Sequence, residues 1–262
     1  MTPADAAQHP VAEPVRPERN VMLVLEYDGT RYHGFQIQAT SVPTVQGELE
    51  RALRQVTGLA TRVAGAGRTD RGVHATGQVV SFRTASALPA AVLRRALNAL
   101  LPADVAVLAA DDAPPVFHAR FSARSRAYRY TILNRPVRSP VERHFTYHVA
   151  LPLGVEAMAE AVQALVGEHD FASFAGAGEE EESTVRRVLA ADCRPEGVKV
   201  FIDVVADAFL PHMVRNIVGT LLLVGMGKLS PVGFREILAA RQRSQAGPTA
   251  PARGLCLTRV SY

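Results

Sequence analysis

The chain has 262 residues, of which 48% are apolar, and a formal net charge of +4. This apolar share is ample for a large core, so stability does not require a metal or disulfides. Only two cysteines occur, Cys193 and Cys256, and neither has a partner at a metal-site spacing. This usage excludes a disulfide-rich secreted scaffold and favours a reducing cytoplasm, with both thiols buried.

Residues 1–19 contain four prolines among scattered polar residues. They lack the basic region followed by an apolar region that marks a secretory signal. The composition therefore predicts a disordered tail. Along the rest of the chain, no stretch approaches the ~20 apolar residues of a membrane span.

The first half of the chain alternates strands and helices. An apolar run that meets Asp-Gly predicts a strand over 21–30. Thr44 is a suitable N-cap, and a closing Gly58 predicts a helix that ends at Val56. The pattern then predicts a strand over 77–84, a helix over 89–101 with Pro102 past its end, and a strand over 104–110.

The second half repeats this mixture. It predicts strands over 125–133 and 254–262, a hairpin of 184–193 and 197–209, and helices over 155–167, 212–225 and 231–240. Hairpins together with helical connections favour two α+β lobes over a uniform parallel sheet. We expect the lobes to span 20–113 and 114–262, because acids and prolines interrupt the pattern at 111–120. The acidic run 179–182 is predicted to be a solvated loop.

The stretch AGAGRTDRGVHATGQVVSF, residues 64–82, combines glycines with charged side chains. Its glycines break the G-x-G-x-x-G spacing of dinucleotide sites, and the Gly-Lys-Ser/Thr end of a P-loop is missing. The histidines are dispersed without zinc-site spacings, and there is no G-x-S-x-G elbow. The sequence therefore predicts neither a nucleotide cofactor nor a metal.

Asp70 lies between Arg68 and Arg71 within that stretch. A carboxylate presented by a glycine-shaped loop can serve as a nucleophile or a general base. It can equally cap a turn and pair with a neighbouring arginine. The stretch by itself leaves both interpretations open.

Arg215 interrupts the apolar helix predicted over 212–225. A charge in such a helix is costly unless it has a partner. The side chain either extends to the surface or reaches into a cleft and pairs with an acid such as Asp70.

Arginines are concentrated between Val116 and Arg143, where Glu142 is the one acid. They are Arg120, Arg124, Arg126, Arg129, Arg135, Arg138 and Arg143. Such a local excess suits contact with a phosphate backbone, and a solvated strand face is the alternative.

Seven stretches of residues 20–262 occur in the same order as in one known protein family. They are YDGTRYHGFQIQ, TVQGELERAL, GAGRTDRGVHATGQVVSF, LNALLPADVAV, FHARFSARSRAYRYTILNR, GEHDFASF and AFLPHMVRNIVGTLL. Together they resemble the tRNA pseudouridine synthase A family. Phe35 stands where that family often has tryptophan, so an aromatic side chain is kept.

The resemblance implies that uridine is isomerised to pseudouridine at positions 38, 39 and 40 of the tRNA anticodon arm, without cofactor or metal. By the same resemblance, Asp70 is the catalytic aspartate and Arg215 pairs with it. Arg68 helps to extrude the nucleotide, and Tyr128 packs on the target base and assists proton transfer. Further substrate contacts are expected from Arg71, His74, Arg124, Arg126 and Arg129.

The implied fold is α+β, with two ferredoxin-like (RNP-like) lobes, a merged, mainly antiparallel sheet and a central active-site cleft. The resemblance also implies a homodimer that holds tRNA across both subunits. Two alternatives are a pseudouridine synthase of other RNA specificity and a catalytically silent RNA-binding protein. The second would not need a carboxylate beside phosphates. Whether Asp70 attacks the base, attacks C1′ or takes the 2′ proton stays open.

Overall fold

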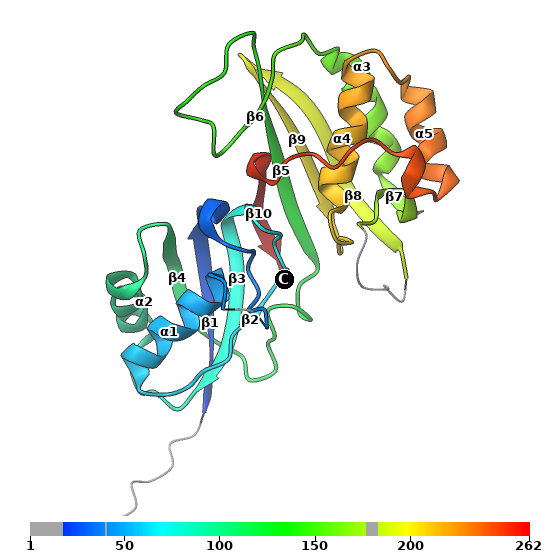
Figure 1. Cartoon of the computed structure of the whole chain (residues 1–262). Coiled ribbons are helices and arrows are strands. Elements are labelled where there is room, and N and C mark those ends of the chain that lie inside the picture. Colours follow the sequence, from blue (N-terminus) through cyan, green and yellow to red (C-terminus); the bar gives the residue numbers. More distant parts are fainter. Residues whose placement is uncertain (1–17, 40, 177–182) are drawn as a thin grey trace, which may run out of the picture.

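The computed structural model describes residues 18–39, 41–176 and 183–262. Its N-terminal half consists of four strands and two helices (Figure 1). They are β1 (Arg19–Tyr27), α1 (Val45–Thr57), β2 (Ala64–Gly65), β3 (His74–Thr84), α2 (Ala90–Leu100) and β4 (Val105–Ala113).

The C-terminal half has three helices and six further strands. They are β5 (Ser125–Asn134), β6 (Tyr147–Val149), α3 (Val155–Val162), β7 (Gly167–Asp170), β8 (Val185–Glu196), β9 (Lys199–Ala206), α4 (Met213–Gly225), α5 (Pro231–Ala240) and β10 (Leu255–Ser261). Short 3₁₀ turns complete the described chain at Gly29–Arg31, Gln163–Leu165, Ala172–Phe174, Arg243–Gln245 and Ala252–Gly254.

The strands form one sheet with the order β4-β1-β3-β10-β5-β9-β8-β7, while β2 pairs with β3 and β6 with β5. Pairing is antiparallel except between β10 and β3 and between β5 and β6. The last strand of the chain, β10, lies between β3 and β5 and so joins the two halves (Figure 1). The predicted α+β class with a merged, mainly antiparallel sheet is confirmed. The division at 113/114 matches the end of β4 and stays a prediction.

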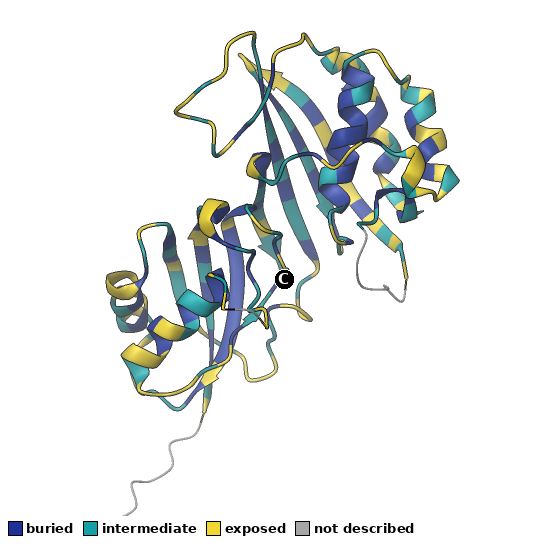
Figure 2. Cartoon of the chain, viewed as in Figure 1, coloured by how far each residue is buried: buried dark blue, intermediate teal, exposed yellow. Residues whose placement is uncertain are grey.

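Local sequence accounts for the main elements. The Thr44 side chain accepts a hydrogen bond from Gly47 N, and Gly58 closes α1 in the left-handed conformation, as predicted. Along β5, Tyr128, Tyr130 and Ile132 alternate with more exposed residues and are buried in the main core. Helix α4 is buried along most of its length and fills the space between the C-terminal part of the sheet and the neighbouring helices (Figure 2).

Several predicted boundaries were wrong, and three of them are instructive. Arg19, assigned to the tail, begins β1, where it pairs with Thr84 across the sheet and forms an ion pair with Asp112. The helix predicted over 155–167 ends earlier, because Gly167 adopts a φ of +118° and starts a strand. The turn expected over 195–197 is confined to Gly197 and Val198, since β8 runs through Glu196 and β9 begins at Lys199.

Two predicted segments lie outside the part of the chain that the structure describes. Residues 1–17 of the predicted tail and the acidic run 179–182 lie outside the described residues. Cys193 is buried as expected, whereas Cys256 is only partly buried. Within the ranges that the structure describes, no helix combines the length and apolar character needed to cross a membrane.

Candidate active site

A cleft of about 1040 Å³ lies where the two halves of the sheet meet. Its lining includes the loop between β2 and β3, the connection between β4 and β5, the start of β5, and the segment that leads into α4. The predicted central cleft is therefore present. Asp70, Arg68, Tyr128 and Arg126 are among its lining residues.

The loop that carries Asp70 is fastened to the N-terminal lobe just before the carboxylate. The carbonyl oxygen of Thr69 accepts from Phe35 N at 3.1 Å, and the Thr69 hydroxyl shares a 2.8 Å hydrogen bond with the Tyr27 hydroxyl. Gln78 Nε2 donates to the carbonyl oxygen of Gly67 at 2.8 Å. These bonds leave the backbone around Asp70 little freedom, which is what a catalytic group needs.

Two glycines of the YDGTRYHGF segment allow the close approach of this loop. A Cβ on Gly34 would lie 2.6 Å from the carbonyl oxygen of Thr69, and a Cβ on Gly29 would lie 2.0 Å from that of Val73. Gly34 also has a φ of +98°, which glycine adopts readily. The first stretch of the family resemblance thus supports the loop that holds the carboxylate.

The Asp70 carboxylate faces α4 of the other lobe. Arg215 Nη1 donates to Asp70 Oδ2 at 3.0 Å, and Arg215 Nε donates to the carbonyl oxygen of Ala250 at 2.8 Å. His212 Nε2 lies 3.5 Å from the same Oδ2. Of the two sequence interpretations of Arg215, the structure shows the pair with Asp70, at 16% side-chain exposure.

Tyr128 lines the same cleft as Asp70. Its ring is 7% exposed and packs edge-on against Phe209, with 5.0 Å between the ring centroids. Burial raises the pKa of the Tyr128 hydroxyl well above its ordinary value, and the Tyr27 and Asp70 side chains raise the pKa further. The hydroxyl is therefore protonated at neutral pH and can donate a hydrogen bond but cannot act as a base.

Arg126 lines the cleft, and its guanidinium donates hydrogen bonds to backbone carbonyl oxygens. Its Nη2 donates to the carbonyl oxygens of Ala66 at 2.8 Å and Arg120 at 2.7 Å, and its Nη1 donates to that of Asp207 at 2.7 Å. Burial lowers the pKa of Arg126. The side chain joins the Asp70 loop, the β4–β5 connection and the end of β9, so it shapes the wall of the cleft.

Three of the other predicted contacts do not line the cleft. Arg71 and Arg124 are exposed, Arg71 on the loop of Asp70 and Arg124 just before β5. Arg129 lies on the face of β5 opposite Tyr128, where its Nε donates to Asp203 Oδ1 at 2.7 Å. Its guanidinium also lies 5.0 Å from the ring centroid of Phe201. We assign Arg129 a structural role in the sheet.

His74 also faces away from Asp70, into a second cavity of about 380 Å³. The Gly29 N–H donates to His74 Nδ1 at 3.0 Å, so Nε2 carries the proton and donates to the carbonyl oxygen of His144 at 2.8 Å. The imidazole packs on Phe145 with a centroid distance of 4.9 Å. We therefore assign His74 a structural role and retain the prediction of substrate contact for residues on the cleft side.

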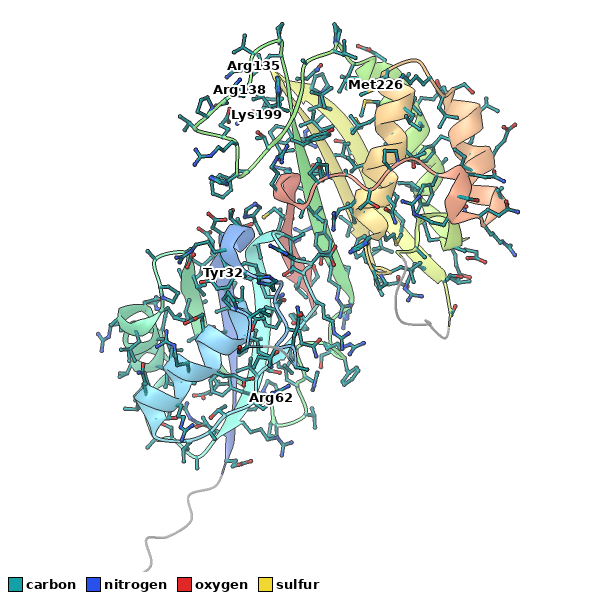
Figure 3. The ribbon with its side chains drawn as sticks, viewed as in Figure 1. Tyr32, Arg62, Arg135, Arg138, Lys199 and Met226 are labelled. Carbon is teal, nitrogen blue, oxygen red and sulfur yellow. The ribbon has the colours of Figure 1, made fainter. Side chains whose placement is uncertain are left out.

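The arginines between 116 and 143 do not form one patch. Arg120 and Arg126 line the cleft, whereas Arg135 and Arg138 lie on the loop after β5, near Lys199 and at the far end of the C-terminal lobe (Figure 3). The strand between them carries the chain away from Asp70. Charge counting along the sequence could not distinguish these locations.

Sequence reasoning missed three side chains at the site. His212 contacts Asp70, Phe209 packs on Tyr128, and Phe121 stands at the rim of the cleft. The spacing of His212 and Arg215, one helical turn apart, was a usable signal. Among the described residues, no group of three or more His, Cys, Asp or Glu side chains is placed to hold a metal ion.

This geometry can be compared with known proteins. A family model described as "tRNA pseudouridine synthase" matches residues 23–122 and 161–262. The chain belongs to this family. The match includes the Asp70 loop, the Phe121 turn and the Arg215 helix, and it omits Tyr128.

Curated relatives align with this chain along nearly their whole length. The tRNA pseudouridine synthase A of Moorella thermoacetica is 48% identical over 241 residues, 92% of this chain and 98% of that protein. The corresponding protein of Brevibacillus brevis is 46% identical over 93% of this chain and 100% of its own length. That of Neisseria gonorrhoeae is 46% identical over 92% of this chain and 91% of its own.

Solved structures give a weaker likeness. A Cbf5-Nop10-Gar1 complex aligns with 88% of this chain and 49% of that chain, with a TM-score of 0.36 and 16% sequence identity.

Proposed function

We propose that this chain converts uridine to pseudouridine at positions 38, 39 and 40 of the tRNA anticodon arm, with Asp70 as its catalytic carboxylate. The observation that carries the proposal is the Asp70–Arg215 pair, whose carboxylate lines the cleft between the lobes together with Tyr128. Membership of the tRNA pseudouridine synthase family supplies the reaction class.

A uridine in a stem must leave its stack before an enzyme can reach its glycosidic bond, at a cost of a few kcal/mol. The cleft is large enough for a nucleotide, and the exposed Arg68 stands at the same loop as Asp70. We assign Arg68 to extrusion of the nucleotide. Contact of the base with the cleft-facing atoms of Tyr128 recovers part of the cost, since contact between a base and an aromatic side chain is favourable.

The reaction exchanges one glycosidic bond for another. The N1–C1′ bond breaks, the uracil rotates, and C5 bonds to C1′; a proton leaves C5 and N1 gains one. Each of the three routes open to Asp70 requires its carboxylate to face the nucleoside in ionised form. Arg215 holds the carboxylate by a charge-assisted hydrogen bond, and Tyr128, as a neutral phenol lining the same cleft, is assigned to donate a hydrogen bond to the bound nucleoside.

The test replaces Asp70. We expect Asp70→Ala to lower the rate of tritium release from tRNA labelled at uridine C5 by at least about 10²–10⁴-fold, the usual contribution of a positioned acid–base or nucleophilic group. Binding of tRNA should persist, because the phosphate contacts are unchanged.

Asp104→Asn is the matched control. Asp104 is a partly buried carboxylate of the same lobe that pairs with Arg31 outside the cleft. Tritium release from Asp70→Ala at the wild-type rate would overturn the assignment.

We also propose a homodimer in the cytoplasm, with each tRNA contacting both subunits. Support comes from the family resemblance alone. Sedimentation equilibrium of the purified chain would measure the mass directly, and a mass that stays at the monomer value of 28.2 kDa across concentrations would contradict the dimer.

A further inference from the structure

An aromatic side chain stands exposed at the rim of the cleft. Phe121 is 77% exposed, although it lines the same cleft as Asp70 and Tyr128. It lies in the connection between β4 and β5, which leads from the N-terminal lobe to the first residue of β5 (Figure 1). Phenylalanine side chains are usually buried in the core, so the exposure of the Phe121 ring at a substrate site needs an explanation.

Two neighbours hold the ring. The His118 imidazole packs against Phe121 with a centroid distance of 4.4 Å, and the Arg120 guanidinium lies 5.6 Å from the ring centroid. The backbone N–H of Arg120 donates to His118 Nδ1 at 3.1 Å, which fixes the imidazole. All three side chains line the cleft. Together they form the rim cluster His118–Arg120–Phe121.

The backbone beneath the rim cluster is fastened to the sheet. Ala119 N donates to Ser81 Oγ, and the Tyr262 hydroxyl donates to the carbonyl oxygen of Ala119, both at 2.9 Å. A further bond closes the turn, from Ser122 N to the carbonyl oxygen of His118 at 2.9 Å. Phe121 is thus exposed on a rigid turn.

We propose that Phe121 is a stacking platform for an unpaired RNA base that flanks the target uridine. This inference rests on the proposed function, because tRNA is taken as the occupant of the cleft. An exposed aromatic ring with a cation and an imidazole beside it suits a nucleobase, whose flat face stacks on the exposed part of the ring while the guanidinium meets the phosphate. Pulling one uridine from the helix leaves neighbouring bases partly unstacked, and Phe121 replaces the lost stacking partner.

The first experiment measures affinity for an anticodon stem-loop RNA. In the Asp70→Ala background, which removes turnover, we expect Phe121→Ala to weaken binding by about 5- to 140-fold, the range that corresponds to the stacking of one base. Phe121→Trp should restore binding, while Phe121→Leu, which is apolar but has no π face, should not.

Val116→Ala is the matched control, because Val116 is 90% exposed in the same connection and does not line the cleft. We expect wild-type affinity from it. Wild-type affinity of Phe121→Ala would overturn the inference, while leaving the Asp70 test of the proposed function untouched.

The second experiment identifies the base. A stem-loop with an abasic nucleotide beside the target uridine should bind the wild-type protein as weakly as the intact RNA binds Phe121→Ala. Combining both changes should then cost little more than either alone. Additive losses at every flanking position would overturn the proposal, as would a sedimentation shift of Phe121→Ala to monomer with unchanged RNA affinity per site, which would make Phe121 a subunit contact.

Discussion

Burying the Arg215 charge on a largely apolar helix costs free energy, and its hydrogen-bond partners compensate for this cost. The side chain is 16% exposed on a helix that carries no other charged residue, where an unpaired charge would destabilise the fold. Its guanidinium bonds to Asp70 from the other lobe and to the carbonyl oxygen of Ala250. The arginine therefore fixes the position of the carboxylate relative to the cleft.

We predict that Arg215→Met lowers the rate of pseudouridine formation by about 10²-fold or more, because a misplaced reacting group costs about that much. Affinity for tRNA should change little, since Arg215 faces Asp70 rather than the cleft rim. Single-turnover tritium release and filter binding measure the two quantities. Arg235→Met, at an exposed position of α5, is the control, and an unchanged rate for Arg215→Met would contradict the positioning role.

Helix α4 shows how one element depends on a close backbone approach. Gly219 lies in its middle, and a Cβ there would come within 1.6 Å of the carbonyl oxygen of Pro248. The same segment continues to Ala250, whose backbone bonds to Arg215 in both directions. The glycine lets the segment before β10 lie against the helix that carries the arginine.

We predict that Gly219→Ala destabilises the protein by about 1–3 kcal/mol, because overpacking against backbone outweighs the gain of roughly 1 kcal/mol in helix propensity. Urea unfolding measures this change. Gly225→Ala is the control in the same helix, since its Cβ would meet the Met158 side chain, which can move. A Gly219→Ala protein as stable as wild type would show that the segment before β10 can shift at little cost in free energy.

The whole molecule carries a modest charge of +4 for a substrate that is a polyanion, so the position of its cations matters more than their number. Arg120 and Arg126 line the cleft, while Arg135 and Arg138 lie at the far end of the C-terminal lobe (Figure 3). Arg124 lies exposed between the rim cluster and β5. This distribution suits an RNA that extends beyond the cleft.

We predict that tRNA affinity falls steeply with salt, and that Arg124→Gln reduces the slope of log affinity against log salt by about 0.7–0.9, the share of one phosphate contact. Fluorescence anisotropy across a salt series measures it. Arg51→Gln should leave the slope unchanged, because Arg51 is paired with Glu48 on α1. Equal slopes for wild type and Arg124→Gln would remove Arg124 from the RNA contacts.

Local rules predicted much of the fold. The N-cap and glycine of α1, the alternation along β5 and the apolar run of α4 depend on residues within a few positions of each other, so the sequence shows them. The strands β2, β6 and β7 have two to four residues each. Such short segments carry no period, and only pairing with long strands makes them strands.

The sequence by itself determined the longer strands, the helices, the cap of α1, and the motifs that suggested an RNA-modifying enzyme. Only the tertiary structure decided which charged side chains meet. Asp70 and Arg215 are 145 residues apart, and Arg129 and Asp203 are 74 apart. The insertion of β10 between β3 and β5 brings the two lobes together, because hydrogen bonding between distant strands depends on the register of the whole sheet. That register places Asp70 in the cleft and turns His74 and Arg129 away from it.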